Sequence, residues 1–162
     1  MIKRESVIQK LARVYLVELT KVVPIEHWRI PIEGRTIGGR NIGNENRGFP
    51  DILISYRGHM IGAEAKAPKA KQSENQKKME IRFNQSQASY FVFHSLDELV
   101  SNLQEIALQI PHNDSASRDT LRMVEVRDRL YNKPQIRRLY DLSRASGVAS
   151  GIGSEEESPA PF

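Results

Sequence analysis

The sequence predicts a mixed α/β fold, with helices flanking a sheet and additional helices at the C-terminal end. Two patterns lead to this prediction. Apolar residues spaced by three and four positions recur along the chain, as in amphipathic helices, and they alternate with short runs rich in β-branched and aromatic residues. The expected order through Ile110 is helix, strand, strand, strand, helix, strand, helix. The length of 162 residues suits one domain with a buried core.

The composition excludes several kinds of chemistry. The chain has no cysteine, which rules out a disulfide scaffold, a cysteine nucleophile and a thiolate zinc site. It has no apolar run of the roughly 18–20 residues that span a membrane, and its N-terminus lacks the apolar segment of a secretory signal. We therefore expect a cytoplasmic protein, bacterial or viral and acting inside the host cell, with no membrane partner. The net charge of +4 permits a nucleic-acid partner without requiring one.

The first part of the chain predicts a helix, a strand and a loop. Residues 5–23 carry one apolar stripe with helical spacing, which Pro24 ends. A strand is expected over residues 25–32. Residues 33–49 contain five glycines and three asparagines, so we expect a long polar loop there, of the kind that often carries function.

The later part of the core predicts two helices around a strand. The sequence Ser73-Glu74-Asn75-Gln76 matches a capping box, in which a serine and a glutamine begin a helix, and this helix should run to about residue 85. Residues 90–94 form an aromatic run that suits a buried strand. Residues 97–110 predict a further helix, with Ser95 as its N-terminal cap.

Beyond this core the chain becomes basic and then acidic. Residues 113–145 form a basic helical extension, with two helices broken at Pro134. Residues 146–162 are small, polar and acidic, and we expect them to be disordered. The core itself is assigned to residues 1–112. The arginines of the extension, which are interspersed with apolar residues, are Arg118, Arg122, Arg127, Arg129, Arg137 and Arg138.

The most informative feature is a pair of carboxylates on neighbouring strands. Strands over residues 51–56 and 59–66 are predicted to form a hairpin around Arg57-Gly58. In that register Asp51 lies opposite Glu64, with Cβ atoms about 4.5–5.5 Å apart. Side chains alternate along a strand, so Lys66 shares the face of Glu64. A slip of one residue in the register would separate the three groups.

Two opposed carboxylates repel each other unless a cation lies between them. Magnesium and manganese prefer oxygen ligands, and a bound divalent metal lowers the pKa of its water and stabilises charge on a phosphate. The patch therefore suits metal-dependent hydrolysis of phosphodiester bonds. The alternative is an ordinary surface hairpin with a carboxylate beside a cross-strand Glu–Lys pair.

The chain resembles the PD-(D/E)xK nucleases at these residues. Gly48-Phe49-Pro50-Asp51 followed by Glu64-Ala65-Lys66 is similar to the motif of that superfamily. The element order also resembles its restriction-endonuclease-like core of a helix, three strands, a helix and a strand. More narrowly, residues 3–103 resemble the VRR-NUC family, through Glu5-Ser6-Val7-Ile8-Gln9, the two motifs above, Ser73 with Gln76, and the run from Ser95 to Leu99.

This resemblance implies a role for each site residue. Asp51 and Glu64 would be metal ligands, together with the backbone carbonyl of Ala65, and Lys66 would be the catalytic lysine. Glu5 matches an N-terminal acidic position that acts on the metal through water, and Gln76 matches a glutamine near the site. Alternatives stay open: an acid near a helix N-terminus is favoured by the helix dipole alone, Glu18 could substitute for Glu5, and Gln76 could serve only the capping box.

Basic residues near the motif predict contacts with phosphates, because such contacts dominate the affinity of proteins for DNA. A solvated helix face is the alternative for some of them. The arginines of the extension could grip DNA or build a subunit contact. The residues near the motif are Arg40, Arg47, Lys69, Lys71, Lys77 and Lys78.

Taken together, the motifs and the resemblance predict a DNA endonuclease that depends on Mg²⁺ or Mn²⁺. Stand-alone members of the VRR-NUC family resemble enzymes that cut four-way Holliday junctions as dimers, so branched DNA and a homodimer are expected. Two other functions remain open. The fold could be a nucleic-acid-binding module without turnover, or a nuclease that cuts RNA or unbranched DNA.

Overall fold

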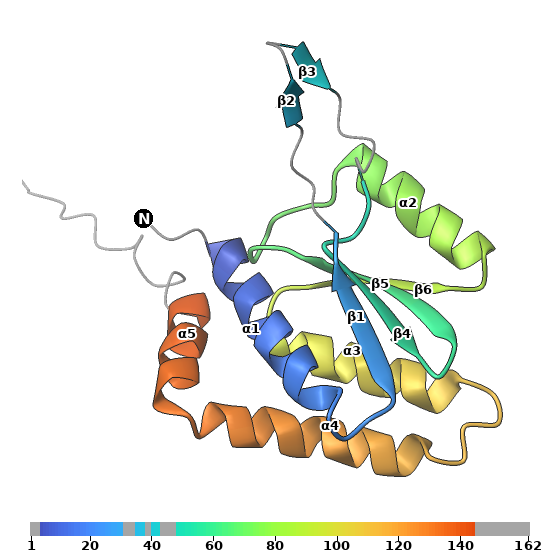
Figure 1. Cartoon of the computed structure of the whole chain (residues 1–162), viewed down its shortest axis with the longest axis vertical. Helices are drawn as coiled ribbons and strands as arrows, with labels where there is room; N and C mark the ends of the chain where they lie inside the picture. The colour runs from blue at the N-terminus through green and yellow to red at the C-terminus, as the bar shows by residue number, and fades with distance from the viewer. Residues whose placement is uncertain (1–3, 31–34, 38–39, 43–47, 145–162) are drawn as a thin grey trace, which may run out of the picture.

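The computed structural model describes residues 4–30, 35–37, 40–42 and 48–144 (Figure 1). It confirms a mixed α/β fold and the expected order of core elements. In chain order the elements are α1 (Arg4–Leu19), β1 (Ile25–Arg29), β2 (Arg35–Ile37), β3 (Arg40–Ile42), β4 (Ile52–Tyr56), β5 (His59–Ala65), α2 (Glu74–Gln85), β6 (Ser89–Phe93), α3 (Leu96–Gln109), α4 (Ala116–Tyr131) and α5 (Pro134–Arg144).

The main sheet has four strands in the order β1-β4-β5-β6. The pairs β1–β4 and β4–β5 are antiparallel, whereas β6 runs parallel to β5. A parallel neighbour requires a crossover connection, and α2 supplies it. Because β5 lies between two strands and under helices, all its residues from Ile61 to Ala65 are buried.

Helices cover both faces of this sheet. On one face α1 and α3 pack against the strands and against each other, and α4 and α5 pack on the outside of that layer (Figure 1). On the other face α2 packs against β5 and β6. Gly62 allows this close approach, since a Cβ atom there would lie 2.8 Å from the ring of Phe83 and 2.9 Å from that of Tyr90.

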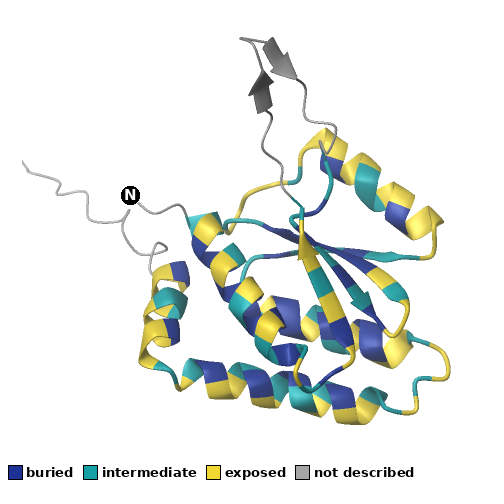
Figure 2. Ribbon diagram, viewed as in Figure 1, coloured by how far each residue is buried: buried dark blue, intermediate teal, exposed yellow. Residues whose placement is uncertain are grey.

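The C-terminal helices belong to the main hydrophobic core. Met123, Val126 and Leu130 of α4 and Ile136 of α5 are buried in the same cluster as the sheet and α1 (Figure 2). Each burial of an aliphatic side chain contributes about 1.5–3 kcal/mol. Most of the apolar residues of the extension therefore pack against the core, whereas Leu121 is 60% exposed.

A buried carboxylate ties α4 to the β4–β5 turn. Asp119 is 1% exposed and accepts hydrogen bonds from Tyr56 Oη (2.7 Å) and Arg57 Nε (3.0 Å). The side-chain amide of Asn113 also donates to Tyr56 Oη, at 2.9 Å. The place of Asp119 on the buried stripe of α4, four residues before Met123, separates it from the exposed acids of the same helix.

Three predictions for the first half of the core differ from the structure by more than one residue. The first helix ends at Leu19, four residues early, and the chain turns through hydrogen bonds such as that from Val23 N to Leu19 O. The strand predicted over residues 25–32 ends at Arg29. The predicted loop contains the antiparallel pair β2–β3, which the β-branched residues on either side of Gly38-Gly39 favour and which the glycine content concealed.

Two further predictions concern the C-terminal tail and membrane association. The predicted acidic tail lies outside the described residues. None of the helices described is long and apolar enough to cross a membrane.

Candidate active site

The β4–β5 hairpin has the register that the sequence predicts. Tyr56 pairs with His59 and Ile52 with Ala63, so the next pair toward the sheet end is Asp51 with Glu64. Arg57 and Gly58 form the turn with φ angles of 49° and 80°. Positive φ at both central residues is typical of a type I′ turn, whose twist matches that of the strands and fixes the register.

Each of the two carboxylates is held by the backbone of the other strand. The backbone N–H of Asp51 donates to Glu64 Oε2 at 3.1 Å. The backbone N–H of Ala65 donates to Asp51 Oδ2 at 2.9 Å. These reciprocal bonds fix both side chains at the end of the strand pair.

The segment before Asp51 explains why the motif carries glycine and proline. Gly48 has a φ of +89°, and a Cβ atom there would lie 2.5 Å from the backbone oxygen of Asn75 at the start of α2. Only glycine fits a position that combines this conformation with this contact. Pro50 is buried, and its ring lies against Gly62, whose added Cβ would be 3.0 Å from Pro50 Cγ. The motif therefore packs Asp51 between α2 and the sheet.

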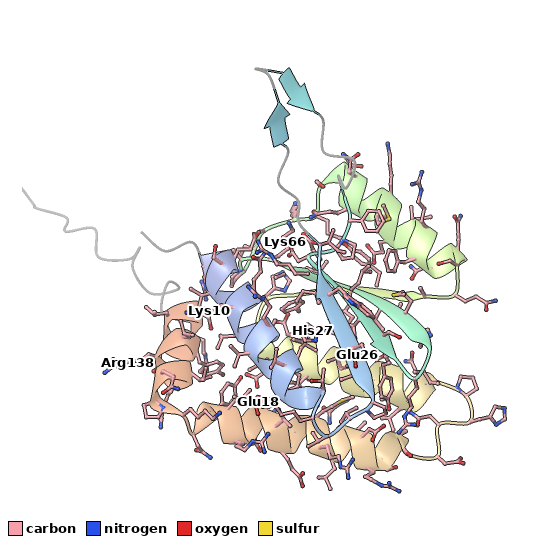
Figure 3. All side chains as sticks on the ribbon, in the orientation of Figure 1. Lys10, Glu18, Glu26, His27, Lys66 and Arg138 are labelled. Carbon is pink, nitrogen blue, oxygen red and sulfur yellow. The ribbon has the colours of Figure 1, made fainter. Side chains whose placement is uncertain are left out.

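Glu64 is nearly inaccessible to solvent, at 1% exposure. Its Oε1 atom forms an ion pair with Lys66 Nζ at 2.9 Å and accepts a hydrogen bond from the side-chain amide of Gln76. Figure 3 shows Lys66 between α1 and α2, at the end of the sheet where these groups meet. The predicted cluster of two carboxylates and one ammonium is thus assembled.

Gln76 serves both of the roles considered for it. Its Oε1 atom accepts from Ser73 N at 2.8 Å, while Ser73 Oγ accepts from Gln76 N at 3.3 Å, which completes the capping box. The amide nitrogen of the same side chain donates to Glu64. The start of α2 and the carboxylate are therefore joined through one side chain.

The buried position perturbs all three ionisable groups. Burial, and then the charge of Asp51, raise the pKa of Glu64 to about 7, although Lys66 opposes the shift. Burial also raises the pKa of Asp51, against the hydrogen bonds from Ala65 and Gln9. Burial alone would lower the pKa of Lys66, but the hydrogen bond to Glu64 and the nearby acids raise it. Perturbed groups in close contact are characteristic of functional sites.

The first helix supplies two further groups. The charge of Glu5 acts on both Asp51 and Lys66, which places Glu5 beside the cluster. Gln9 hydrogen-bonds the Asp51 carboxylate, and the sequence prediction missed this role. The available signal was its spacing, since residues four apart lie on the same face of a helix. Glu18 is not at the site, because it pairs with Lys21 at 2.8 Å near the other end of α1.

The oxygen atoms of this cluster fit a small divalent cation. Asp51 and Glu64 offer hard ligands, and one or two carboxylates with waters are the usual protein ligands of Mg²⁺. In the described part of the chain, no three His, Asp or Glu side chains gather closely enough to hold a metal directly. The action of Glu5 through water and the carbonyl of Ala65 as a ligand both stay predictions.

Four of the six residues predicted to bind phosphate have described side chains, and all four are exposed. Lys69, Lys71 and Lys78 are exposed, and Lys77 is exposed but paired with Glu74 at 2.8 Å. Arg40 lies in β3, but its side chain, like the whole of Arg47, falls outside the described residues.

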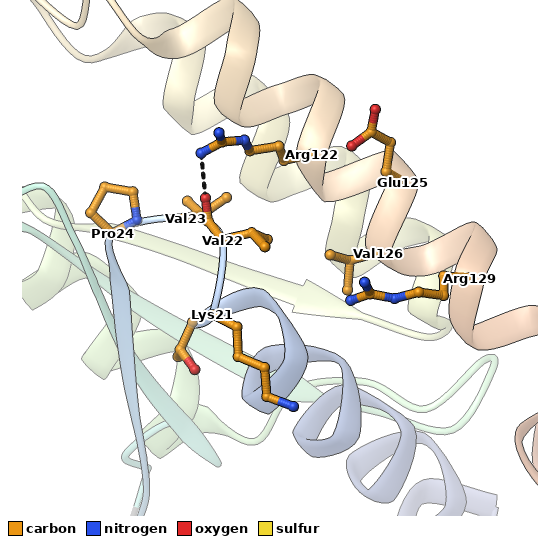
Figure 4. A pocket seen from close by; sticks show the side chains of 9 residues that line it. Lys21, Val22, Val23, Pro24, Arg122, Glu125, Val126 and Arg129 are labelled. Carbon is orange, nitrogen blue, oxygen red and sulfur yellow. Dashed lines mark hydrogen bonds between the residues drawn. The ribbon is translucent and has the colours of Figure 1, made fainter.

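Several arginines of the extension have structural partners, among them Arg127 and Arg122. Arg127 lies 2.8 Å from Asp128 and 3.6 Å from Asp97, and Arg122 donates to the carbonyl of Val22 at 2.6 Å. The latter contact borders a groove between the end of α1 and α4 (Figure 4). That groove contains none of the carboxylate cluster, so it is separate from the candidate active site.

Comparisons with known proteins give one match. A scan against protein-family models and a search of the curated proteins find nothing. A solved structure is similar to this chain with 22% identity and a TM-score of 0.46, over 64% of this chain and 97% of the other. It is described as a "VRR_NUC domain", the family that the sequence motifs resemble.

Proposed function

We propose that this protein is a metal-dependent endonuclease that hydrolyses phosphodiester bonds in DNA. The observation that carries the proposal is the juxtaposition of Asp51, Glu64 and Lys66 on one buried patch, in the register the sequence predicts. Burying two adjacent carboxylates costs free energy, since burial raises the pKa of both and the charge of Asp51 raises that of Glu64 further. A hairpin with only a structural role has no need for that cost.

In this proposal Asp51 and Glu64 hold a Mg²⁺ or Mn²⁺ ion. The bound metal supplies a Lewis acid, which stabilises charge on the phosphate and lowers the pKa of a bound water. Lys66 is ion-paired through Nζ and therefore cationic, so it acts by holding a phosphate oxygen or orienting the attacking water rather than by removing a proton. Gln76 and Gln9 hold Glu64 and Asp51 in place. Glu5 orients a water beside the cluster.

The proposed substrate is branched DNA, such as a four-way junction, and the proposed active form is a homodimer. Both rest on the resemblance to VRR-NUC nucleases that are similar to junction-cutting dimers. A two-fold dimer presents two identical sites, which suits paired cuts in a substrate that itself has two-fold symmetry.

Cleavage assays on a panel of substrates test this proposal. Labelled four-way junction, flap, duplex and single-stranded DNA of one sequence, and the matching RNA, are each incubated with Mg²⁺ or Mn²⁺ and with EDTA. We expect metal-dependent cutting that is fastest on the junction. Equal cutting of all DNA forms would retain the nuclease and remove the selectivity. Tight binding without any cutting would favour a nucleic-acid-binding module instead.

A further inference from the structure

A second groove lies beside the carboxylate cluster. Its walls come from four separate parts of the chain: the start of α1, the loop after β5, the junction of β6 with α3, and the end of α5. The residues that matter here are Arg4, Lys69, His94, Glu98, Ser143 and Arg144. We call it the α5 groove, because the end of α5 completes it.

Three connections along the chain bring this groove next to the site. Arg4 directly precedes Glu5, and Lys69 is the third residue after Lys66. The backbone N–H of Lys66 donates to the carbonyl of Phe93 at 3.0 Å, and His94 is the next residue. A ligand in the α5 groove would therefore be a close neighbour of a ligand at Lys66.

The charge of the groove favours an anion. Arg4, Lys69 and Arg144 are cationic, and Glu98 is the one acid among the described residues that line the groove. Glu98 Oε2 already accepts hydrogen bonds from the backbone N–H of His94 at 2.8 Å and from its ring Nδ1 at 3.0 Å. Three cations thus outnumber one carboxylate, and one of the two oxygens of that carboxylate already accepts two hydrogen bonds.

The two arginines are held in place before any ligand arrives. Arg4 donates from Nε to the carbonyl of Ser143. The Arg144 guanidinium lies 5.5 Å from the ring centre of Tyr140 and donates to its hydroxyl at 3.2 Å, and that hydroxyl donates to Asp97 at 2.9 Å. An arginine has five N–H donors, so both side chains keep several for an anion. Ordering them beforehand reduces the entropy lost on binding.

Lys69 occupies a backbone conformation that suits glycine. The turn from Ala67 to Ala70 is closed by a 2.9 Å hydrogen bond, with Pro68 at its second position and Lys69 at its third with a φ of +69°. The third position of such a turn usually carries glycine or asparagine. The backbone conformation disfavours a lysine at this position. A requirement for positive charge in the groove explains why the position carries one.

We propose that the α5 groove binds a backbone phosphate of the nucleic acid, next to the phosphate at Lys66. The inference rests on the proposed nuclease function and deepens it, because it names a second contact with the substrate and gives α5 a part in binding. Arginine recognises phosphate through paired N–H donors, which the two held guanidinium groups provide.

Affinity measurements on the full chain test the proposal. Fluorescence anisotropy gives the Kd for labelled duplex and junction DNA in EDTA, so that the probe is not consumed, over a range of salt concentrations. Arg144→Ala and Lys69→Ala should each weaken binding about fivefold or more and reduce the salt slope by about one. The matched control is Lys21→Ala, which removes one exposed cation beyond the opposite end of α1, and it should change the Kd less than twofold. The helix alone, from Arg4 to Leu19, spans about 22 Å by helix rise.

Lys69→Gly separates binding from folding. Glycine accepts the positive φ, so the melting temperature should stay level or rise while DNA affinity falls as in Lys69→Ala. A melting temperature and an affinity that fall together would indicate a structural role and contradict the proposal.

The outcomes also distinguish this proposal from the nuclease proposal. If the wild type cleaves DNA, but Arg144→Ala and Lys69→Ala bind it like Lys21→Ala, the groove proposal is wrong and the nuclease stands. If these variants lose affinity but the wild type never cleaves, the reverse holds. If inorganic phosphate raises the melting temperature of the wild type but not of Arg144→Ala, with DNA affinities equal, the groove takes a free anion and the proposal is overturned.

Discussion

Gln76 donates a hydrogen bond to Glu64 with the same side chain that closes the capping box of α2. The position of a helix and the position of an active-site carboxylate are thus set by one residue. A shift of the start of α2 would release Glu64, and a change at Glu64 would disturb the cap.

The two roles of Gln76 can be separated by mutation. Ser73→Ala removes the cap acceptor alone and should lower the free energy of unfolding by about 1 kcal/mol with little effect on cleavage. Gln76→Ala removes the cap partner and the contact with Glu64, so it should lower both stability and cleavage. Chemical denaturation and single-turnover cleavage measure the two effects. If Ser73→Ala lowers cleavage as much as Gln76→Ala does, the contact with Glu64 is unimportant.

Glu64 should destabilise the metal-free protein at neutral and alkaline pH. Its folded pKa of about 7 lies above its ordinary value of 4.5, so between these values the folded state binds the proton more tightly. Stability from this group is therefore full below about pH 4.5 and is lost as the pH rises through 7. Glu64→Gln cannot ionise, so its unfolding free energy relative to the wild type should rise by about 2–3 kcal/mol from pH 4.5 to pH 8.

One consequence of this substitution does not depend on pH. Glutamine has one acceptor oxygen where Glu64 has two, so Glu64→Gln loses part of the hydrogen bonding at this position, and that loss shifts the whole curve equally. Chemical denaturation in EDTA across this pH range gives the curve. A stability difference that is flat with pH would show that Glu64 is not perturbed by burial and Asp51.

Adding a divalent metal should stabilise the wild type. Mg²⁺ or Mn²⁺ that binds only the folded state raises the melting temperature as its concentration passes the Kd, by mass action. Asp51→Asn and Glu64→Gln should lose this shift, and EDTA should reverse it in the wild type. Thermal melting with a metal titration measures it. An equal shift in the wild type and both variants would place the metal elsewhere.

Two glycines with similar positive φ angles should differ in the cost of replacement by alanine. Gly58 has a φ of +80° and nothing within 4 Å of an added Cβ, so Gly58→Ala should cost about 1 kcal/mol. Gly48→Ala adds a contact of 2.5 Å with the backbone of Asn75 to the same strain, so it should cost about 2–4 kcal/mol and reduce cleavage by displacing Asp51. Denaturation of both variants tests this, and equal costs would contradict the close packing at Gly48.

The buried carboxylate of α4 should be needed for stability and not for chemistry. Asp119→Ala leaves Tyr56 and Arg57 without their acceptor and should cost about 3 kcal/mol. The exposed Asp141 of α5 gives the control, since Asp141→Ala should cost less than about 0.5 kcal/mol. Cleavage per folded molecule should be unchanged in both. A small cost for Asp119→Ala would mean that the C-terminal helices are only loosely joined to the core.

The sequence predicts the site well where local rules determine it. Turn chemistry at Arg57-Gly58 sets the hairpin register, and the register alone brings Asp51 to Glu64. The capping box at Ser73 likewise identifies the start of α2.

Long-range packing is less accessible from sequence. Helical spacing places Gln9 on the face of Glu5, but it does not identify Asp51 as the partner. Asp119 lies on the buried stripe of α4, but nothing in that stripe identifies Tyr56 as its hydrogen-bond donor. The β2–β3 pair was missed for a different reason, because its glycines suggest a loop while its flanking residues form strands.

Cleavage by Lys66→Met shows whether the clustered lysine takes part in metal-dependent hydrolysis. Single-turnover rates on the preferred DNA are measured with Mg²⁺ at saturating enzyme, beside Lys21→Met as the matched control. We expect a rate at least about 100-fold lower for Lys66→Met, an unchanged rate for Lys21→Met, and no cleavage by any form in EDTA. Cleavage by Lys66→Met at the wild-type rate, or wild-type cleavage that persists in EDTA, would contradict the proposed function.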